Sequence, residues 1–136
     1  MPPHLRVLNP SAISKPTGYS HVVEVMGPGR TVYVAGQLGL NADGWLVGGP
    51  NDFRAQAIQT YENLKAALAA VGAGFEHVVK LTNYLTDLHT HLPIFREVRD
   101  RYVRTELPPA STTVQIARLA REGALIEIEA IAVLPP

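Results

Sequence analysis

The sequence predicts one α+β domain in which short strands come first and strands then alternate with helices. Three observations predict this class. The N-terminal third holds short β-branched segments between turn residues, the middle holds two segments with apolar side chains at helical spacing, and the C-terminus holds a long strand whose two faces differ. With 136 residues, the chain is expected to form a single domain, 1–136, with a core of its own.

Three strands are expected before the first helix. Residues 6–8 predict a short edge strand, and residues 21–26 and 31–35 are rich in β-branched side chains. Gly27-Pro28-Gly29-Arg30 joins the latter two, and this is turn chemistry typical of a hairpin. We therefore expect the second and third strands to pair with each other.

The first helix is predicted over residues 52–71. Its apolar side chains recur at steps of three and four, at Phe53, Ala57, Tyr61, Leu64, Leu68 and Val71. Asn51 or Asp52 can cap its start, and Gly72 suits its end. Such a helix buries one face against a sheet.

A strand over residues 78–86 and a second helix over about 90–105 follow. The apolar stripe of this helix is Leu92, Phe95, Val98 and Tyr102. Thr90 can cap the helix, and Pro93 is tolerated in a first turn. Pro108-Pro109 ends this region, and residues 112–116 predict the next strand.

The final strand, residues 125–134, predicts how the layers are arranged. Side chains alternate across a strand, so one face holds Ile126, Ile128, Ala130, Ala132 and Leu134. The other face holds Leu125, Glu127, Glu129, Ile131 and Val133. Two helices fit best on the first face, which leaves large aliphatic side chains on an open face. Exposed apolar patches of this kind mark interfaces, so the chain is expected to oligomerise.

Composition excludes several classes of function. The chain has no cysteine, so disulfides, thiolate nucleophiles and cysteine-bound metals are excluded. Its formal net charge is zero and no basic run occurs, so no nucleic-acid partner is expected. No apolar run is long enough to cross a bilayer and no signal peptide is evident, so no membrane association and a cytoplasmic location are expected. His89-x-His91 lacks a third ligand, so neither a metal nor a cofactor is expected.

Six segments, taken together, resemble one known family. They are Gly18-Tyr19-Ser20, Val34-Ala35-Gly36-Gln37-Leu38, Gln56-x-x-Gln59-x-x-x-Asn63-Leu64-Lys65, Val78-Val79-Lys80-Leu81-Thr82, Pro109-Ala110-Ser111-Thr112-Thr113-Val114 and Ile126-Glu127-Ile128-Glu129-Ala130-Ile131-Ala132. In this order they cover nearly the whole chain, which resembles the RidA/YjgF family of reactive intermediate deaminases, also called endoribonuclease L-PSP-like proteins.

The resemblance implies a chorismate-mutase-like subunit, with a mixed sheet and two helices on one face. It also implies a homotrimer, in which three sheets form a central barrel and ligand clefts lie at the subunit boundaries. Deaminase members hydrolyse reactive enamines and imines, such as 2-aminoacrylate, to 2-keto acids and ammonia. Other members are described as ribonucleases, translation inhibitors or chaperone-like proteins.

Three residues match functional positions of the family. Tyr19 matches the cleft tyrosine, Gly36 can offer its backbone amide, and Glu127 matches the glutamate that opens the Glu-Ile-Glu-Ala segment. The resemblance implies that Glu127 positions or deprotonates the attacking water. From the residues alone, Glu127 is equally a structural carboxylate, and Tyr19 is a loop aromatic packed on the sheet.

Four site positions depart from the family pattern. Ala35 stands where serine is usual, Arg99 where an asparagine often lies, and Thr113 where a cysteine lies. Ser111 stands at the position of the arginine that binds the substrate carboxylate. Ser111 and Thr113 can donate hydroxyls to a ligand, or are ordinary strand residues. Whether Arg99 or Arg104 replaces the missing arginine stays open.

The leading hypothesis is that the trimer binds a small enamine, imine or amide-type metabolite, with hydrolysis as a further activity. Ser111 at the arginine position predicts poor hydrolysis of 2-imino acids, and a ligand that is neutral or differently charged. Whether the protein is an enzyme stays open; an enzyme of this kind is a hydrolase or deaminase acting on C=N or C–N bonds. The alternative is a non-catalytic ligand-binding or chaperone-like protein, and the third hypothesis is an endoribonuclease.

Overall fold

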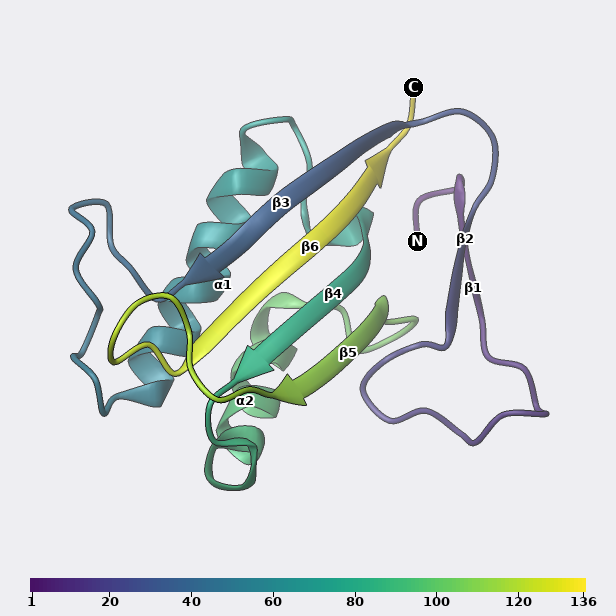
Figure 1. Cartoon of the computed structure of the whole chain (residues 1–136). Coiled ribbons are helices and arrows are strands. Elements are labelled where there is room, and N and C mark those ends of the chain that lie inside the picture. The colour runs from purple at the N-terminus through teal and green to yellow at the C-terminus, as the bar shows by residue number, and fades with distance from the viewer.

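A mixed four-stranded sheet, in the order β3-β6-β4-β5, forms the centre of the molecule. A computed structural model describes all 136 residues, and Figure 1 shows both helices behind this sheet. The elements in chain order are β1 (Leu5–Leu8), β2 (Val22–Val25), β3 (Arg30–Leu38), α1 (Phe53–Ala69), a short 3-10 helix (Phe75–His77), β4 (Val78–Leu85), α2 (Leu88–Tyr102), β5 (Ala110–Gln115) and β6 (Ile126–Leu134). The predicted α+β class is confirmed.

The connections follow from strand direction. β6 runs antiparallel to both of its neighbours, β3 and β4, whereas β4 and β5 are parallel. Parallel strands cannot be joined by a tight hairpin, so the chain needs a crossover between them. α2 is that crossover, and it therefore lies against the sheet close to the β5 edge (Figure 1).

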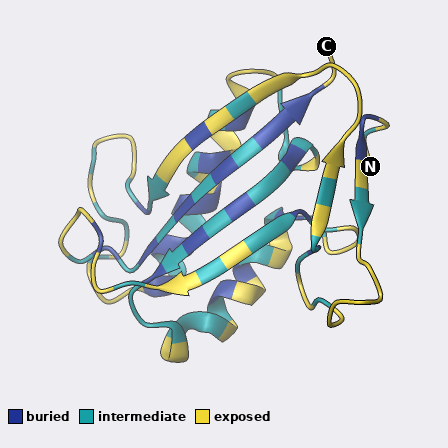
Figure 2. Cartoon of the chain, turned by 45° about the vertical axis from the view of Figure 1, so that its right-hand side comes forward, coloured by how far each residue is buried: buried dark blue, intermediate teal, exposed yellow.

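The core lies between the sheet and the helices. The face of β6 predicted to lie under them is buried throughout, and its members are Ile126, Ile128, Ala130, Ala132 and Leu134. The colouring along β6 in Figure 2 shows buried residues alternating with half-buried ones over most of the strand. This confirms the predicted alternation.

The opposite face of the sheet carries fewer apolar residues than the sequence predicts. Tyr33, on this face, is 78% exposed, and Ile131 is half-buried. Leu125 was expected here, but it precedes β6 and packs against the core cluster. Val133 is only 5% exposed, because Gly29 lies against its side chain and His4 bonds its carbonyl.

The predicted hairpin at residues 27–30 is wrong. β2 pairs with β1 in a separate two-stranded sheet, and β3 pairs with β6. The chain before β2 is held at the far edge of the main sheet, where the Ser20 amide donates to the Pro109 carbonyl over 3.1 Å. His4 Nε2 donates to the Val133 carbonyl over 2.7 Å and fixes β1. Figure 1 shows β1 and β2 standing beside the sheet.

Both helices begin at aspartates. The Asp52 carboxylate accepts from the Ala55 amide over 3.0 Å, which selects Asp52 over Asn51 as the cap of α1. Asp87, and not Thr90, caps α2, because its carboxylate accepts from the Thr90 amide over 3.1 Å. The helix therefore starts two residues earlier than predicted, and Pro93 lies beyond the first turn. Neither helix is long and apolar enough to cross a membrane.

The polar residues of α1 hold loops in place. Gln56 is fully buried, and its amide donates to the carbonyls of Gly49 and Gly123. Its oxygen accepts from the Leu125 amide over 2.8 Å. The Asn63 amide donates to the carbonyls of Leu38, at the end of β3, and Leu40, just beyond it. The Gln-x-x-Gln-x-x-x-Asn pattern of this helix is thus structural and lies outside the site.

Candidate functional site

A hollow of about 260 Å³ lies between β5, α2 and the segment Thr17–Tyr19. It is lined on one side by hydroxyl groups and on the other by α2. Four of the residues expected in the site line it, namely Tyr19, Arg99, Ser111 and Thr113. No acidic side chain lines it.

Alternation along β5 places two hydroxyls in the hollow. Ser111 and Thr113 point to the same side of the strand as α2, and the buried Asn83 on β4 lies between them. The Asn83 amide donates to Ser111 Oγ over 2.9 Å and to Thr113 Oγ1 over 3.1 Å. Each hydroxyl thus accepts a bond from the protein and keeps its own proton to donate to a ligand.

Arg99 reaches the hollow from α2. Its Nε donates to Asp100 Oδ1 over 3.0 Å, and its guanidinium lies 6.0 Å from the centre of the Phe95 ring. A Cβ at Gly18 would lie 2.7 Å from one terminal nitrogen and 2.8 Å from the other. Gly18 also has a φ of +77°, which other residues rarely adopt. Glycine at this position therefore lets the tip of Arg99 lie against the backbone.

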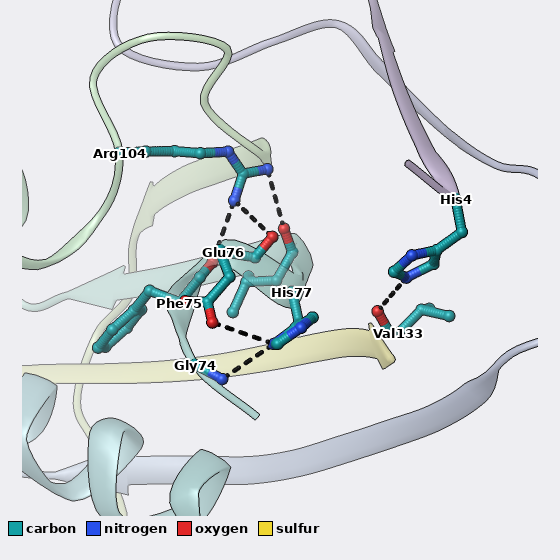
Figure 3. A network of polar contacts seen from close by, with 8 residues as sticks. His4, Gly74, Phe75, Glu76, His77, Arg104 and Val133 are labelled. Atoms are coloured by element: carbon teal, nitrogen blue, oxygen red, sulfur yellow. Dashed lines mark hydrogen bonds and ion pairs between the residues drawn. The ribbon is translucent and has the colours of Figure 1, made fainter. Parts of the chain in front are cut away.

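Arg104 has a structural role. Its guanidinium donates to the carbonyls of Phe75 and Glu76 (Figure 3). It also donates to the carbonyls of Val78 and Leu107. Burial lowers the pKa of Arg104, as expected for a cation removed from water. Every nitrogen of the guanidinium donates to a backbone oxygen. Arg104 therefore connects the end of α2 to the start of β4.

The other expected site residues lie elsewhere. Glu127 on β6 packs against Gly36 on β3, where a Cβ would lie 2.6 Å from Glu127 Oε2. Partial burial, and then the like charge of Glu129, raises the pKa of Glu127. Ala35 and Glu129 line a second hollow of about 390 Å³. This hollow lies over β3, β6 and β4.

Glu129 and Glu127 differ in their partners. The Tyr84 hydroxyl donates to Glu129 Oε1 over 2.7 Å, which holds this carboxylate on the sheet. The carboxylate of Glu127 has no hydrogen bond within the chain and is half-buried. Of the two carboxylates, Glu127 is therefore the one free to act on a ligand or a water molecule.

The expected site residues thus form two groups, one at the β5 edge of the sheet and the other on β6 and the opposite edge strand β3. Ser111 aligns across the strands with Leu81, then Ala130, then Val34. Three strand spacings separate β5 from β3, or about 14 Å. In addition, Ser111 faces the helices, whereas Glu127 lies on the opposite face of the sheet. Within a single chain the two groups do not meet.

Comparisons with known proteins identify the family. The sequence profile of the endoribonuclease L-PSP family matches residues 10–134. The chain is 46% identical to Protein DfrA of Myxococcus xanthus over 85% of the chain and 84% of that protein. It is 40% identical to the 2-iminobutanoate/2-iminopropanoate deaminase of Mus musculus, over 87% and 82% of the two chains. This chain belongs to the RidA/YjgF family.

Solved structures of the RidA/YjgF family have the same fold. The crystal structure of the Rid family protein YyfB from Yersinia pestis matches with a TM-score of 0.85 and 37% identity, over 96% of this chain and 99% of that one. A putative endoribonuclease from Thermotoga maritima matches with a TM-score of 0.71 and 36% identity, over 94% and 93%. The subunit is therefore a chorismate-mutase-like α+β fold, as the sequence predicts.

Several residues of the hollow could not be found through the RidA/YjgF motifs. Arg96 lies beside Arg99 in it, and Leu88 and Leu92 form its apolar part with Phe95. The signal was present in the helix spacing, because Leu92 to Arg96 and Phe95 to Arg99 are each four residues apart. Residues at that spacing share one face of a helix.

Proposed function

We propose that the protein is a homotrimeric RidA-type hydrolase that acts on the C=N or C–N bond of a small enamine, imine or amide-type metabolite. One observation carries the proposal. The carboxylate of Glu127 rests against the Gly36 backbone without a hydrogen-bond partner, and its surroundings raise its pKa. A carboxylate of raised pKa is a better proton acceptor than an ordinary glutamate.

The proposed reaction uses water as the nucleophile. Glu127 accepts a proton from water while the oxygen attacks the carbon of the C=N bond, which gives a tetrahedral carbinolamine. Glu127 passes this proton to the nitrogen and then relays the carbinolamine hydroxyl proton to the same nitrogen as the C–N bond breaks, so ammonia leaves and the carbonyl product remains. Atoms balance, because one imine and one water give one ketone or aldehyde and one ammonia. No cofactor is needed for this chemistry.

The trimer is proposed because the site is divided. The Ser111 group lies at the β5 edge and the Glu127 group lies on β6 and β3, on the opposite face of the sheet, so each group can complete the site of a neighbouring copy. Tyr33, which is 78% exposed, and Ile131 pair across β3 and β6 and lie on the open face of the sheet, which also carries Glu127. Covering this face by neighbouring subunits removes both side chains from water. The relatives named as 2-iminobutanoate/2-iminopropanoate deaminases support hydrolysis as the chemistry.

Small 2-imino acids are expected to be poor substrates. Ser111 is uncharged and too short to hold a carboxylate from β5, so it cannot orient the adjacent imine carbon. A lost charged hydrogen bond alone costs about 10- to 150-fold, and misorientation adds to that loss. The proposal therefore favours imines or amides with other substituents at the reacting carbon.

The test is a hydrolysis assay with a panel of imines, enamines and amides, which includes 2-imino acids generated by an amino-acid oxidase. We expect turnover of at least one compound that is lost in Glu127→Gln and kept in Thr112→Ser. Ser111→Arg is expected to raise the rate on 2-imino acids. If no compound is turned over, the non-catalytic alternative replaces the hydrolase. RNA cleavage abolished by Glu127→Gln would replace it with the endoribonuclease.

A further inference from the structure

We propose that a groove leading out of the hollow binds an unbranched aliphatic substituent of the substrate. The groove has a volume of about 470 Å³ and lies between the start of α2 and the end of β5. This assignment rests on the proposed function for the claim that the reacting group of the substrate lies in the hollow. It adds the class of substituent that extends from the reacting carbon.

The groove and the hollow adjoin each other. Three residues line both of them, namely Leu88, Leu92 and Arg96. Beyond these, the groove extends over His89, Pro93 and Gln115. A ligand whose polar end lies in the hollow can therefore extend into the groove along the side chains of the two leucines.

Alternation along β5 forms the other side of this path. Ser111 and Thr113 line the hollow, and Gln115, the next residue on the same side of the strand, lines the groove. About 7 Å separates Thr113 from Gln115 along the strand, a distance that about five or six linked carbon atoms cover. The length of β5 therefore sets the length of the substituent.

Apolar groups form the wall of the groove. Leu88 and Leu92 are four residues apart, so they share one face of α2, and both are half-buried. Pro93 adds an apolar ring that has no amide proton to donate. The stem of Arg96 can lie along this surface while its guanidinium stays in water. Methylene groups of a ligand are therefore better partners for this wall than polar groups.

The end of the groove is fixed in place before a ligand arrives. Gln115 Oε1 accepts from the Leu88 amide over 2.9 Å, which joins the end of β5 to the first turn of α2. The Asp87 carboxylate caps the same turn by accepting from the Thr90 amide. Because both bonds hold this turn, binding costs little conformational entropy of the protein.

The hollow determines the polar end of the ligand. The hydroxyls of Ser111 and Thr113 keep protons to donate, because their oxygens already accept from Asn83. They suit an uncharged acceptor, such as an amide oxygen or an imine nitrogen. No acidic side chain lines the hollow or the groove, so neither offers a partner for a cation. The ligand class is therefore an uncharged amide or imine with a linear aliphatic substituent.

The experiment measures the affinity for butanamide, hexanamide, octanamide and decanamide by calorimetry. It uses the intact protein and Glu127→Gln, in which the proposed reaction cannot consume the probes. We expect the affinity to rise about 2- to 4-fold for each added methylene up to octanamide. Decanamide should gain little more, because the groove ends at Gln115. A probe of the length of octanamide, with ether oxygens in place of two methylenes, should bind about 10-fold more weakly than octanamide.

Variants at exposed positions test the groove itself. Pro93→Glu places a charge in it and should weaken octanamide binding about 10-fold relative to butanamide binding. Val71→Glu is the matched control, because Val71 is also exposed and lines neither the hollow nor the groove. His89→Leu extends the apolar wall and should strengthen octanamide binding about 2-fold or more, a gain that loss of folding cannot imitate. Thermal unfolding checks that each variant is folded.

The assignment is overturned if affinity is independent of the length of the carbon chain, as it is when a second copy covers the groove. It is also overturned if decanamide gains over octanamide as much as octanamide gains over hexanamide, or if Pro93→Glu and Val71→Glu have equal effects. Binding that depends on length, without turnover of any compound, would support the groove and remove the hydrolase. Turnover that depends on Glu127, with the same kcat/KM for short and long substrates, would do the reverse.

Discussion

At the scale of single residues, the carboxylate pair of β6 sets the pH response of the site. In the proposed reaction Glu127 must be ionised to accept a proton, and both burial and the charge of Glu129 raise its pKa. Activity should therefore fall as pH drops through this raised pKa. A raised pKa means that Glu127 holds its proton more strongly in the folded chain than in the unfolded chain. Its contribution to the free energy of unfolding is therefore present at low pH and is lost as pH rises through the raised pKa.

Glu129→Gln tests this coupling. The substitution removes the like charge, and its amide oxygen can still accept from Tyr84. We expect the acid limb of the rate profile to move to lower pH, while Glu62→Gln, on α1, leaves the limb in place. The measurement is the rate against pH for any compound that proves to be a substrate. An acid limb that stays in place would show that burial alone sets the pKa of Glu127.

At the scale of helices and strands, Asp52 determines where α1 begins. Its carboxylate accepts from the Ala55 amide, while Asn51 makes no such bond. We expect Asp52→Ala to lower the free energy of unfolding by about 1 kcal/mol, and Asn51→Ala to change it little. Chemical denaturation of the two variants measures this. Equal losses would mean that the helix is capped by both residues.

The elements also show where sequence reasoning succeeds and fails. The alternation on β6 and the spacing in α1 report burial directly, so both were predictable. The pairing of β2 was not, because Gly27-Pro28-Gly29 permits a turn without requiring one. Contacts distant in sequence, such as Ser20 with Pro109 and His4 with Val133, decide it.

Some residues of the candidate site could be predicted from the sequence, and others could not. The family motifs pointed to Tyr19, Ser111 and Thr113, which the structure brings to one hollow, and to Glu127, which it places apart from them. They gave no means of choosing between Arg99 and Arg104. That choice depends on which guanidinium is occupied by carbonyls, and only the packing around the end of α2 shows this.

At the scale of the whole molecule, the proposed function requires assembly, because the two groups of site residues do not meet within one chain. We expect light scattering at micromolar concentration to give three times the mass of the chain. Tyr33→Glu should lower this mass, because it places a charge on the open face of the sheet. Val71→Glu is the control, since Val71 is an exposed apolar residue just beyond α1. A monodisperse monomer of the natural chain would refute the proposed trimer and the division of the site between subunits.

The outer edge of β3 carries a further consequence. β3 is nine residues long, and in a single chain one of its edges has no strand beside it. An unpaired edge of this length is a template for aggregation, which proteins avoid by closing the sheet or covering the edge. Subunit contact would then protect solubility as well as build the site. Dilution or mild heating that separates the subunits should lead to precipitation before the core of each chain unfolds.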